Sequence, residues 1–328
     1  QLTTSMNRNF WIIALISLVN FLSLTILIPI IYLYGKQFGL NDFQTSFLFA
    51  IYSISQFFAT PVIGIADIFG RKPLLIISLA GTVVANFIAG TATTATILFL
   101  ARFLDGITGG NNSVAQAVIS DVTTPENRAR GFGVLGAALG VGFILGPTIS
   151  LLAQHISLGA SFLVSSGLAA IALLITIFFL PETLKHKAAT HNIFDLGLGN
   201  LVKGLFIPKV GILLLINFFI GTTYTIFTYA FQPYFLNVLG QKSQGLTMMF
   251  ILFGTLSLLM QTQGIKILTR KFTLTSMLFL ALFIRSTSFI LMPMWQNISY
   301  FIAISIIFSI FNSLVQPLIN TLISLNTK

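Results

Sequence analysis

Long apolar stretches that carry almost no charge make up most of this chain, and short polar connections separate them. A run of about 20 apolar residues is long enough to cross the hydrocarbon core of a bilayer as a helix. We therefore predict an all-α protein that crosses a membrane many times. The ten expected spans, with ends placed to within several residues, are 10–34, 43–66, 73–89, 95–120, 131–153, 160–180, 210–239, 245–265, 272–292 and 298–325.

Composition argues independently against a water-soluble protein: 55% of the residues are hydrophobic, 7% are charged, and the mean hydropathy is +0.95. A soluble domain carries roughly 25% charged residues. The net charge of +10 does not indicate nucleic-acid binding, because the basic residues are scattered between apolar stretches. The chain has no cysteine, and its three histidines lack a second metal ligand at a helical spacing. We expect no metal, no cofactor and no enzyme activity.

The placement of lysine and arginine predicts the orientation. If the N-terminus lies inside, thirteen basic residues face the cytoplasm, and only Lys36 and Lys242 lie outside. This bias is the positive-inside pattern, and it places the N-terminus and Lys328 in the cytoplasm, in a bacterial-type inner (plasma) membrane. The cytoplasmic set is Arg8, Arg71, Lys72, Arg128, Arg130, Lys185, Lys187, Lys203, Lys209, Lys266, Arg270, Lys271 and Lys328.

A long polar connection divides the chain. We expect an N-terminal six-helix bundle over 1–180, a cytoplasmic linker over 181–208, and helices 7–10 of an incomplete C-terminal bundle over 209–328. The basic segment Gly264–Lys271, which follows the eighth span, weakly resembles Gly64–Lys72, which follows the second span. An internal repeat of this kind is typical of a transporter built from two repeated halves, in which case the second half is two helices short.

The connection between the second and third spans carries the most informative motif. Asp67, Gly70, Arg71 and Lys72 stand in PVIGIADIFGRKPL, between two uncharged segments. This stretch resembles the loop between helices 2 and 3 of the major facilitator superfamily, G-x-x-x-D-R-x-G-R-R/K, with Ile68 at the position of the first arginine. The resemblance implies two helix bundles that rock about a central substrate site by alternating access.

Asp121 ends the fourth span, where the same family has an acidic residue that pairs with a cation of this loop. The resemblance implies an Asp121–Arg71 pair that closes the cytoplasmic side. The alternative interpretation is that Asp121 only marks the end of the helix and that the nearby basic residues only reflect the positive-inside pattern, with no gate. The expected gate group is Asp67, Gly70, Arg71, Lys72 and Asp121.

The fourth span also contains Arg102-Phe-Leu-Asp105-Gly106, which resembles motif B of the family. Spacings of three and four place Arg102, Asp105 and Gly106 on one helical face. Charges in hydrocarbon are costly and should face the bundle interior or a wet cavity. Two interpretations stay open: the pair neutralises itself and fixes the helix, or Arg102 tunes Asp105 as a proton carrier.

Glycines crowd the fifth span. Gly142, Gly146 and Pro147 combine a small-xxx-small spacing, which lets helix backbones approach closely, with a proline that permits a bend. The pattern resembles motif C, G-x-x-x-G-P-x-x-G-G, of drug/proton antiporters, although Ser150 and Leu151 replace the closing glycines. Together with the Pro-Glu-Thr-Leu run over 181–184, it indicates the tetracycline-resistance and multidrug branch.

Polar residues at helical spacing mark one face of spans 1, 7 and 10 and are candidates to line a substrate cavity. Such residues also join helices by hydrogen bonds. Asn20 stands where related antiporters often have an aspartate, and it cannot carry a proton. Arg285 lies about 10 Å of helix from the outer end of the ninth span, so we expect it to snorkel. The cavity candidates are Asn20, Asn217, Thr228, Gln232, Asn312 and Gln316.

These features predict a secondary active transporter, expected to be a monomer in the lipid bilayer, that couples proton movement to export of a small amphipathic compound. One alternative is a truncated, transport-inactive member that serves as a subunit or assembly factor of a larger complex. That alternative implies a protein partner if the chain truly ends after the tenth helix. Another is a sugar-like nutrient transporter, which Asn20 and the amide stripes permit.

Overall fold

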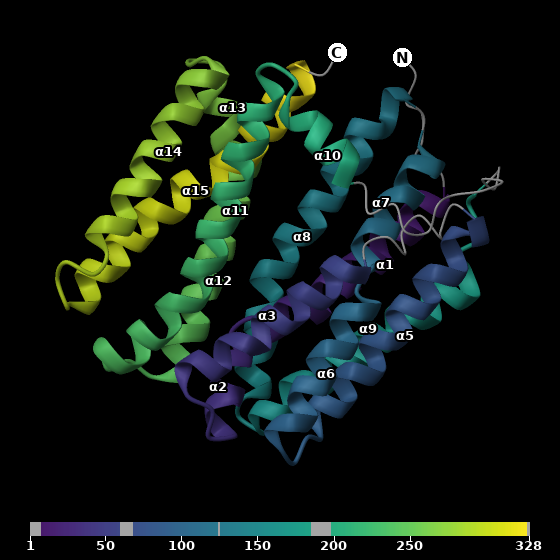
Figure 1. The fold of residues 1–328 in the computed structure, drawn as a ribbon, viewed down its shortest axis with the longest axis vertical. Helices are drawn as coiled ribbons and strands as arrows, with labels where there is room; N and C mark the ends of the chain where they lie inside the picture. Colours follow the sequence, from purple (N-terminus) through teal and green to yellow (C-terminus); the bar gives the residue numbers. More distant parts are fainter. Residues whose placement is uncertain (1–7, 60–67, 124, 185–197, 327–328) are drawn as a thin grey trace. The chain divides into compact units, whose positions relative to one another are not determined.

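Helices account for the regular structure in the part of the chain that the computed structural model describes, which is residues 8–59, 68–123, 125–184 and 198–326 (Figure 1). The chain separates into two compact units, unit 1 (Gln1–Leu196) and unit 2 (Gly197–Lys328). Their boundary falls inside the polar connection 181–208. Each unit is considered by itself.

Unit 1 is a bundle in which α1 packs along α8 and α9, α5 packs along α6 and α9, and α3 packs on α6 (Figure 1). Apolar residues such as Leu79, Val114 and Phe162 are fully buried between these helices. The helices are α1 (Arg8–Leu27), α2 (Ile31–Gln37), α3 (Asp42–Ala59), α5 (Arg71–Gly90), α6 (Ala95–Thr108), α7 (Asn111–Val122), α8 (Pro125–Ala153) and α9 (Leu158–Phe179).

Small polar side chains also join the helices of unit 1. The hydroxyl groups of Ser23 on α1 and Ser165 on α9 lie 2.8 Å apart, and Asn86 on α5 donates to Ser165 at 3.1 Å. All three side chains are buried. In an apolar environment such hydrogen bonds hold helices together where the hydrophobic effect is weak.

The fourth predicted span is not one continuous helix. The structure divides it into α6 and α7, which are separated at Gly109 and Gly110. Sequence reasoning missed the break because hydropathy measures only length and polarity, although the two adjacent glycines were its signal. Eight helices are long and apolar enough to cross a membrane within the described residues, and the second span is described only as far as Ala59, as α3.

In unit 2, α15 packs against α14, α12 and α11. A short helix, α10, lies in the segment expected to be a polar linker, and π-helical turns over Tyr234–Val238 and Met260–Gly264 extend α11 and α12. The helices are α10 (Leu198–Leu205), α11 (Val210–Pro233), α12 (Ser243–Leu259), α13 (Ile265–Leu268), α14 (Leu274–Leu291) and α15 (Ile298–Asn326).

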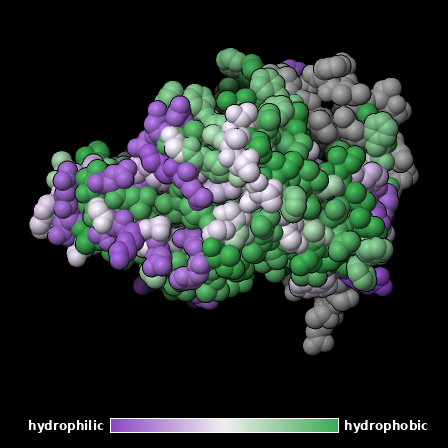
Figure 2. Space-filling model, turned by 90° about the horizontal axis from the view of Figure 1, so that it is seen from below, coloured by the Kyte–Doolittle hydropathy of each residue, from purple (hydrophilic) through white to green (hydrophobic). Residues whose placement is uncertain are grey.

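Large apolar side chains cover the outside of the helices. Phe178 on α9 is 73% exposed and Phe279 on α14 is 74% exposed. Figure 2 shows apolar residues over much of the visible surface, with hydrophilic residues gathered in patches. A surface of this kind is stable in lipid and not in water.

Candidate functional site

A buried ion pair occupies the interior of unit 1. Thr94 caps the start of α6, and two turns further on Arg102 Nη1 lies 3.2 Å from Asp105 Oδ2. The two side chains are only 5% and 8% exposed. Gly106 brings α6 close to α3, because a Cβ at this position would overlap the carbonyl oxygen of Tyr52.

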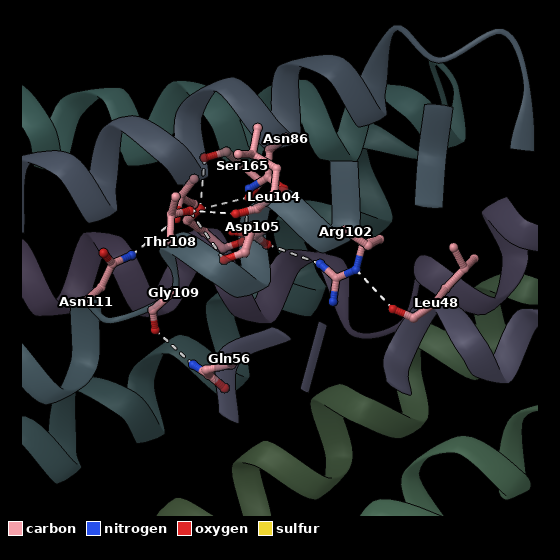
Figure 3. Close-up of polar contacts among 12 residues, drawn as sticks. Leu48, Gln56, Asn86, Arg102, Leu104, Asp105, Thr108, Gly109, Asn111 and Ser165 are labelled. Atoms are coloured by element: carbon pink, nitrogen blue, oxygen red, sulfur yellow. Dashed lines mark hydrogen bonds and ion pairs between the residues drawn. The ribbon is translucent and has the colours of Figure 1, made fainter. Parts of the chain in front are cut away.

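Helix α3 supplies further partners for the arginine. Arg102 Nε donates to the Leu48 carbonyl at 3.3 Å (Figure 3). The guanidinium carbon also lies 4.5 Å from the centre of the Tyr52 ring. On the other side, Thr82 of α5 lies beside the Asp105 carboxylate. Buried charges are tolerated only when paired and hydrogen-bonded, and both conditions hold here.

The pair lies directly before the helix break. Gln56 on α3 donates to the Gly109 carbonyl at 2.9 Å, and Asn111 begins α7 (Figure 3). A cavity of about 380 Å³ opens beside the break. Because a helix start carries a partial positive charge, the break also adds oriented dipoles inside the bundle. The lining residues are Ser53, Gln56, Phe57, Ala59, Gly109, Gly110, Asn112 and Ser113.

A second polar cluster joins the ends of α5, α7 and α9. Arg71 Nε lies 3.1 Å from Asp121 Oδ2, and Thr183, just after α9, donates to the same oxygen at 3.1 Å. Lys72 donates to the Ile177 carbonyl at 2.8 Å. Of the expected gate group, the structure thus brings Arg71 and Asp121 together, whereas Asp67 lies outside the described residues.

Glu182 holds this cluster in place and was not anticipated as a site residue. Its carboxylate accepts hydrogen bonds from the backbone N–H groups of Arg71 (3.0 Å) and Lys72 (3.2 Å), at the start of α5. Burial acts to raise the pKa of Glu182, but these bonds and those from Leu184 and Thr183 outweigh it and hold the pKa below its ordinary value. An anion is favoured there because the first N–H groups of a helix have no intrahelical partner.

Gly70 is required by the same contact. Its φ of 119° lies in a region that favours glycine, and a Cβ would overlap the Glu182 carboxylate. The signal for Glu182 in the sequence was the Pro-Glu-Thr-Leu run. Its partner lies 111 residues earlier, so local pattern could not reveal the contact.

The glycines of α8 form a close contact with α1. Gly142 packs on Phe21, and its carbonyl accepts a hydrogen bond from Thr25 at 2.7 Å. A Cβ on Gly146 would overlap the Thr25 side chain. Pro147 lies inside α8 one residue later. These residues therefore determine how closely the two helices approach.

The cavity candidates have different environments. Asn20 accepts from Asn111 at 3.3 Å, and Gln316 donates to Asn217 at 3.0 Å, which links α15 to α11. Thr228 bonds back to its own helix. Gln232 is fully buried and donates to the Thr228 carbonyl at 2.7 Å.

Arg285 does not snorkel, contrary to expectation. The residue is 3% exposed, and its guanidinium donates to Asn312 Oδ1 (2.8 Å), to the Ile220 carbonyl (3.0 Å) and to the Thr223 hydroxyl (2.8 Å). It also lies over the Phe289 ring, 5.1 Å from its centre. Distance from the helix end was a poor guide, because α11 and α15 supply acceptors inside unit 2. Asn312 is therefore bound to this arginine.

Three residues around Asp105 also escaped the sequence analysis: Tyr52, Thr82 and Asn111. Each is a polar residue in an apolar span, which was the only indication in the sequence. None of them belongs to a row of polar residues repeated at a helical spacing. Within the residues that the structure describes, no group of three or more histidine or acidic side chains is arranged as metal ligands would be.

Comparison with known proteins places these features in a family. Residues 13–328 match the family model described as Major Facilitator Superfamily. The tetracycline resistance protein, class H, of Pasteurella multocida is 33% identical over 191 residues, which are 57% of this chain and 48% of that protein. The class C protein of Escherichia coli is 41% identical over 141 residues, 43% of this chain and 35% of that protein. The chain therefore spans about half or less of the length of these curated relatives.

A solved structure agrees with the fold. The human organic anion transporter MFSD10 (TETRAN) superimposes with a TM-score of 0.72 at 20% identity, over 97% of this chain and 86% of that one. At this identity the likeness concerns the fold alone. Because the family model covers nearly the whole chain, this integral multi-pass membrane protein belongs to the Major Facilitator Superfamily, whose members are transporters.

Proposed function

We propose that this chain works by alternating access as a proton-coupled exporter of small amphipathic compounds, with Asp105 as the proton carrier. The observation that carries the proposal is the Arg102–Asp105 pair beside the break between α6 and α7. A buried carboxylate whose only ionic partner within the described residues is a single arginine can be released from it by one proton. Buried ionisable groups in transporters commonly have such roles. The relatives named for tetracycline and multidrug resistance support the substrate class.

Purified full chain in proteoliposomes tests this function. We expect labelled tetracycline, used as the probe, to move in exchange for protons, with a pH-sensitive dye reporting the proton flux. Asp105→Asn should abolish the coupled proton flux but keep exchange of substrate for substrate, because the neutral side chain retains the shape of the site.

Asp42→Asn is the matched control, since Asp42 pairs with Lys36 and Tyr32 at the outer surface of unit 1. It should behave as the wild type. Absence of both tetracycline movement and proton flux, or an unchanged flux in Asp105→Asn, would contradict the proposal.

The second polar cluster is the proposed cytoplasmic gate. The Arg71–Asp121 pair, braced by Thr183 and Glu182, ties three helix ends together, so opening the gate requires that this pair be broken. Because the chain has no cysteine, a single Ser113→Cys substitution in the cavity beside the helix break can be labelled specifically. We expect faster labelling by a thiol reagent when Asp121→Asn weakens the gate.

Lys36→Gln, which breaks the exposed Lys36–Asp42 pair, is the control and should leave the labelling rate unchanged. Equal labelling rates in the wild type and in Asp121→Asn would exclude a gating role for the pair. Asn20, Asn217 and Gln316 remain the candidates to contact substrate.

A further inference from the structure

A cavity of about 400 Å³ opens on the surface of unit 2, where the end of α12 and the helices α13, α14 and α15 meet. Phe272 and Leu280, which line it, are 56% and 51% exposed, so the cavity faces outward. Exposed phenylalanines at 279 and 283 continue this apolar surface along α14. Such a surface marks contact with lipid in a membrane protein. The lining includes Met260, Leu268, Phe272, Ser276, Met277 and Leu280.

The lining of this cavity favours hydrocarbon. Ser276 is the one polar side chain among the described residues that line it, and its hydroxyl is already bonded to Thr273 at 2.8 Å. Leu280 lies about 9 Å of helix beyond Leu274, where α14 begins. The apolar lining therefore extends from the end of a membrane-spanning helix toward its middle, which is the direction of a lipid acyl chain.

The turn between α13 and α14 forms one edge of the cavity (Figure 1). The N–H groups of Lys271 and Phe272 both donate to the Leu268 carbonyl at 3.0 Å, so residues 268–272 make one tight turn. Leu268 and Phe272 at its two ends line the cavity, and Arg270 and Lys271 lie between them. Because the turn joins two membrane-spanning helices, it lies where the hydrocarbon meets the phosphate headgroups.

The basic residues at this edge lack a counter-charge. Lys266, Arg270 and Lys271 are exposed, and none of them forms a hydrogen bond or ion pair through its side chain with another residue that the structure describes. All seven acidic residues of the chain precede residue 197, so unit 2 has no carboxylate side chain to pair with them. The start of α14 adds the partial positive charge of a helix N-terminus. An anion at this edge is therefore favoured.

We propose that this cavity binds an anionic phospholipid of the surrounding bilayer. One acyl chain lies along the apolar lining, and Arg270 and Lys271 bind the phosphate group at the edge of the cavity. The arginine is suited to this because its planar guanidinium donates two parallel hydrogen bonds to phosphate oxygens. Lys266 adds positive charge near the headgroup.

The charge also predicts which phospholipid binds. Phosphatidylglycerol carries a net negative charge and an uncharged glycerol headgroup. Phosphatidylcholine has the same phosphate, but its ammonium group has no acidic partner in unit 2 and lies close to two cations. Each lysine or arginine near an anionic lipid surface contributes about fivefold to binding. The cavity should therefore prefer the anionic lipid.

Native mass spectrometry of the purified full chain in detergent micelles tests this preference, because it counts the lipids bound to each protein molecule during a titration. The probes are dioleoyl phosphatidylglycerol and dioleoyl phosphatidylcholine, which have identical acyl chains. We expect the first phosphatidylglycerol to bind about tenfold more tightly than the first phosphatidylcholine.

The headgroup contact is tested by the double variant Arg270→Gln/Lys271→Gln. It should remove the preference for phosphatidylglycerol and leave the binding of phosphatidylcholine nearly unchanged. Lys242→Gln is the matched control, because Lys242 is an exposed cation at the opposite end of unit 2, just before α12. It should keep the preference.

The acyl-chain contact is tested by a pair of variants on α14. Leu280→Trp places a larger side chain in the cavity and should weaken phosphatidylglycerol binding roughly tenfold. Phe279→Trp, at a 74% exposed neighbour outside the described lining, should have no effect. Both positions are more than half exposed, so both variants should fold.

Equal affinity for the two lipids, a lost preference in Lys242→Gln, or unchanged binding in Leu280→Trp would overturn the proposal. Competition by millimolar inorganic phosphate as effective as competition by the lipid would indicate a phosphate site without an acyl chain. Displacement of the lipid by tetracycline would assign the cavity to substrate. Either result would also overturn it. Lipid binding is measured without transport, so this inference stands or fails independently of the proposed function.

Discussion

Among the side chains that the structure describes, each unit contains one buried arginine, and the two are satisfied in opposite ways. Arg102 in unit 1 has a carboxylate partner, Asp105. Within the described part of the chain, the hydrogen-bond acceptors of Arg285 in unit 2 are all neutral, namely an amide, a hydroxyl and a backbone carbonyl. The reason is in the sequence: all seven acidic residues precede residue 197, so unit 2 has no carboxylate side chain to offer.

This difference separates two uses of buried charge. An ion pair can be switched by one proton, because protonation removes its negative partner. An arginine held by dipoles has no such partner and keeps its charge, so Arg285 fixes α11, α14 and α15 in place without a proton-dependent state. Among the residues that the structure describes, the buried ion pair that one proton could switch lies in unit 1.

The largest expected effect tests the ion pair. Asp105→Leu leaves Arg102 buried without a counter-charge and should lower the free energy of unfolding by about 3–5 kcal/mol, measured by denaturant titration in mixed micelles. Asp105→Asn should cost less, because it keeps a hydrogen-bond acceptor. Recovery of most of the lost stability in the double variant Arg102→Met/Asp105→Leu would verify the cause. Equal stability of Asp105→Leu and the wild type would show that the pair is not structurally important.

A smaller effect is expected from the close contact between α1 and α8, which compares a crowded glycine with an open one. Gly146→Ala should destabilise by about 1–3 kcal/mol, because the new methyl group overlaps Thr25. Gly221→Ala on α11 in unit 2 meets no atom within 4 Å and should stabilise by up to about 1 kcal/mol. Thermal melts in detergent measure both. A loss in Gly221→Ala as large as that in Gly146→Ala would mean that helix propensity does not explain the contrast.

The neutral acceptors of Arg285 provide the next test. Asn312→Leu removes the acceptor of Arg285 Nε, and hydrogen bonds to charged groups contribute about 1.5–3 kcal/mol. We expect a loss near the lower end of that range, because Ile220 and Thr223 remain as partners. The loss should not depend on pH between 5 and 8, whereas that of Asp105→Leu should diminish wherever Asp105 becomes protonated. A pH-dependent loss in Asn312→Leu would remove the distinction between the two arginines.

The smallest effect concerns the helix starts. In unit 1 Glu182 caps α5 from a distant segment, whereas in unit 2 Thr273 caps α14 locally. Because the folded-state pKa of Glu182 is lowered, its stabilisation is present above its unfolded pKa and is lost as pH falls through the folded pKa. Glu182→Gln should therefore flatten the acid limb of the stability curve, by less than about 1 kcal/mol because the group is exposed.

Asp42 also has a lowered pKa, caused by hydrogen bonds from Lys36 and Tyr32, so wild-type stability falls in acid for more than one reason. The difference between the wild type and Glu182→Gln isolates the part due to Glu182. An unchanged difference at every pH would show that the carboxylate does not stabilise the start of α5.

Much of the candidate site was predictable because it lies within single segments. Arg102, Asp105 and Gly106 share a face through their spacing, and Gly142, Gly146 and Pro147 act within one helix. Thr82 and Asn111 could not be selected from among many polar residues. Their importance arises only where α5, α6 and α7 meet.

The sequence by itself determined which segments can cross a membrane, because hydropathy sums over one stretch of chain. It also determined that all seven acidic residues precede residue 197. Only the tertiary structure decided the partners: Glu182 with the start of α5, Arg285 with Asn312, and Asn111 between α1 and α5. A contact between helices depends on which faces packing brings together, and no single segment carries that information.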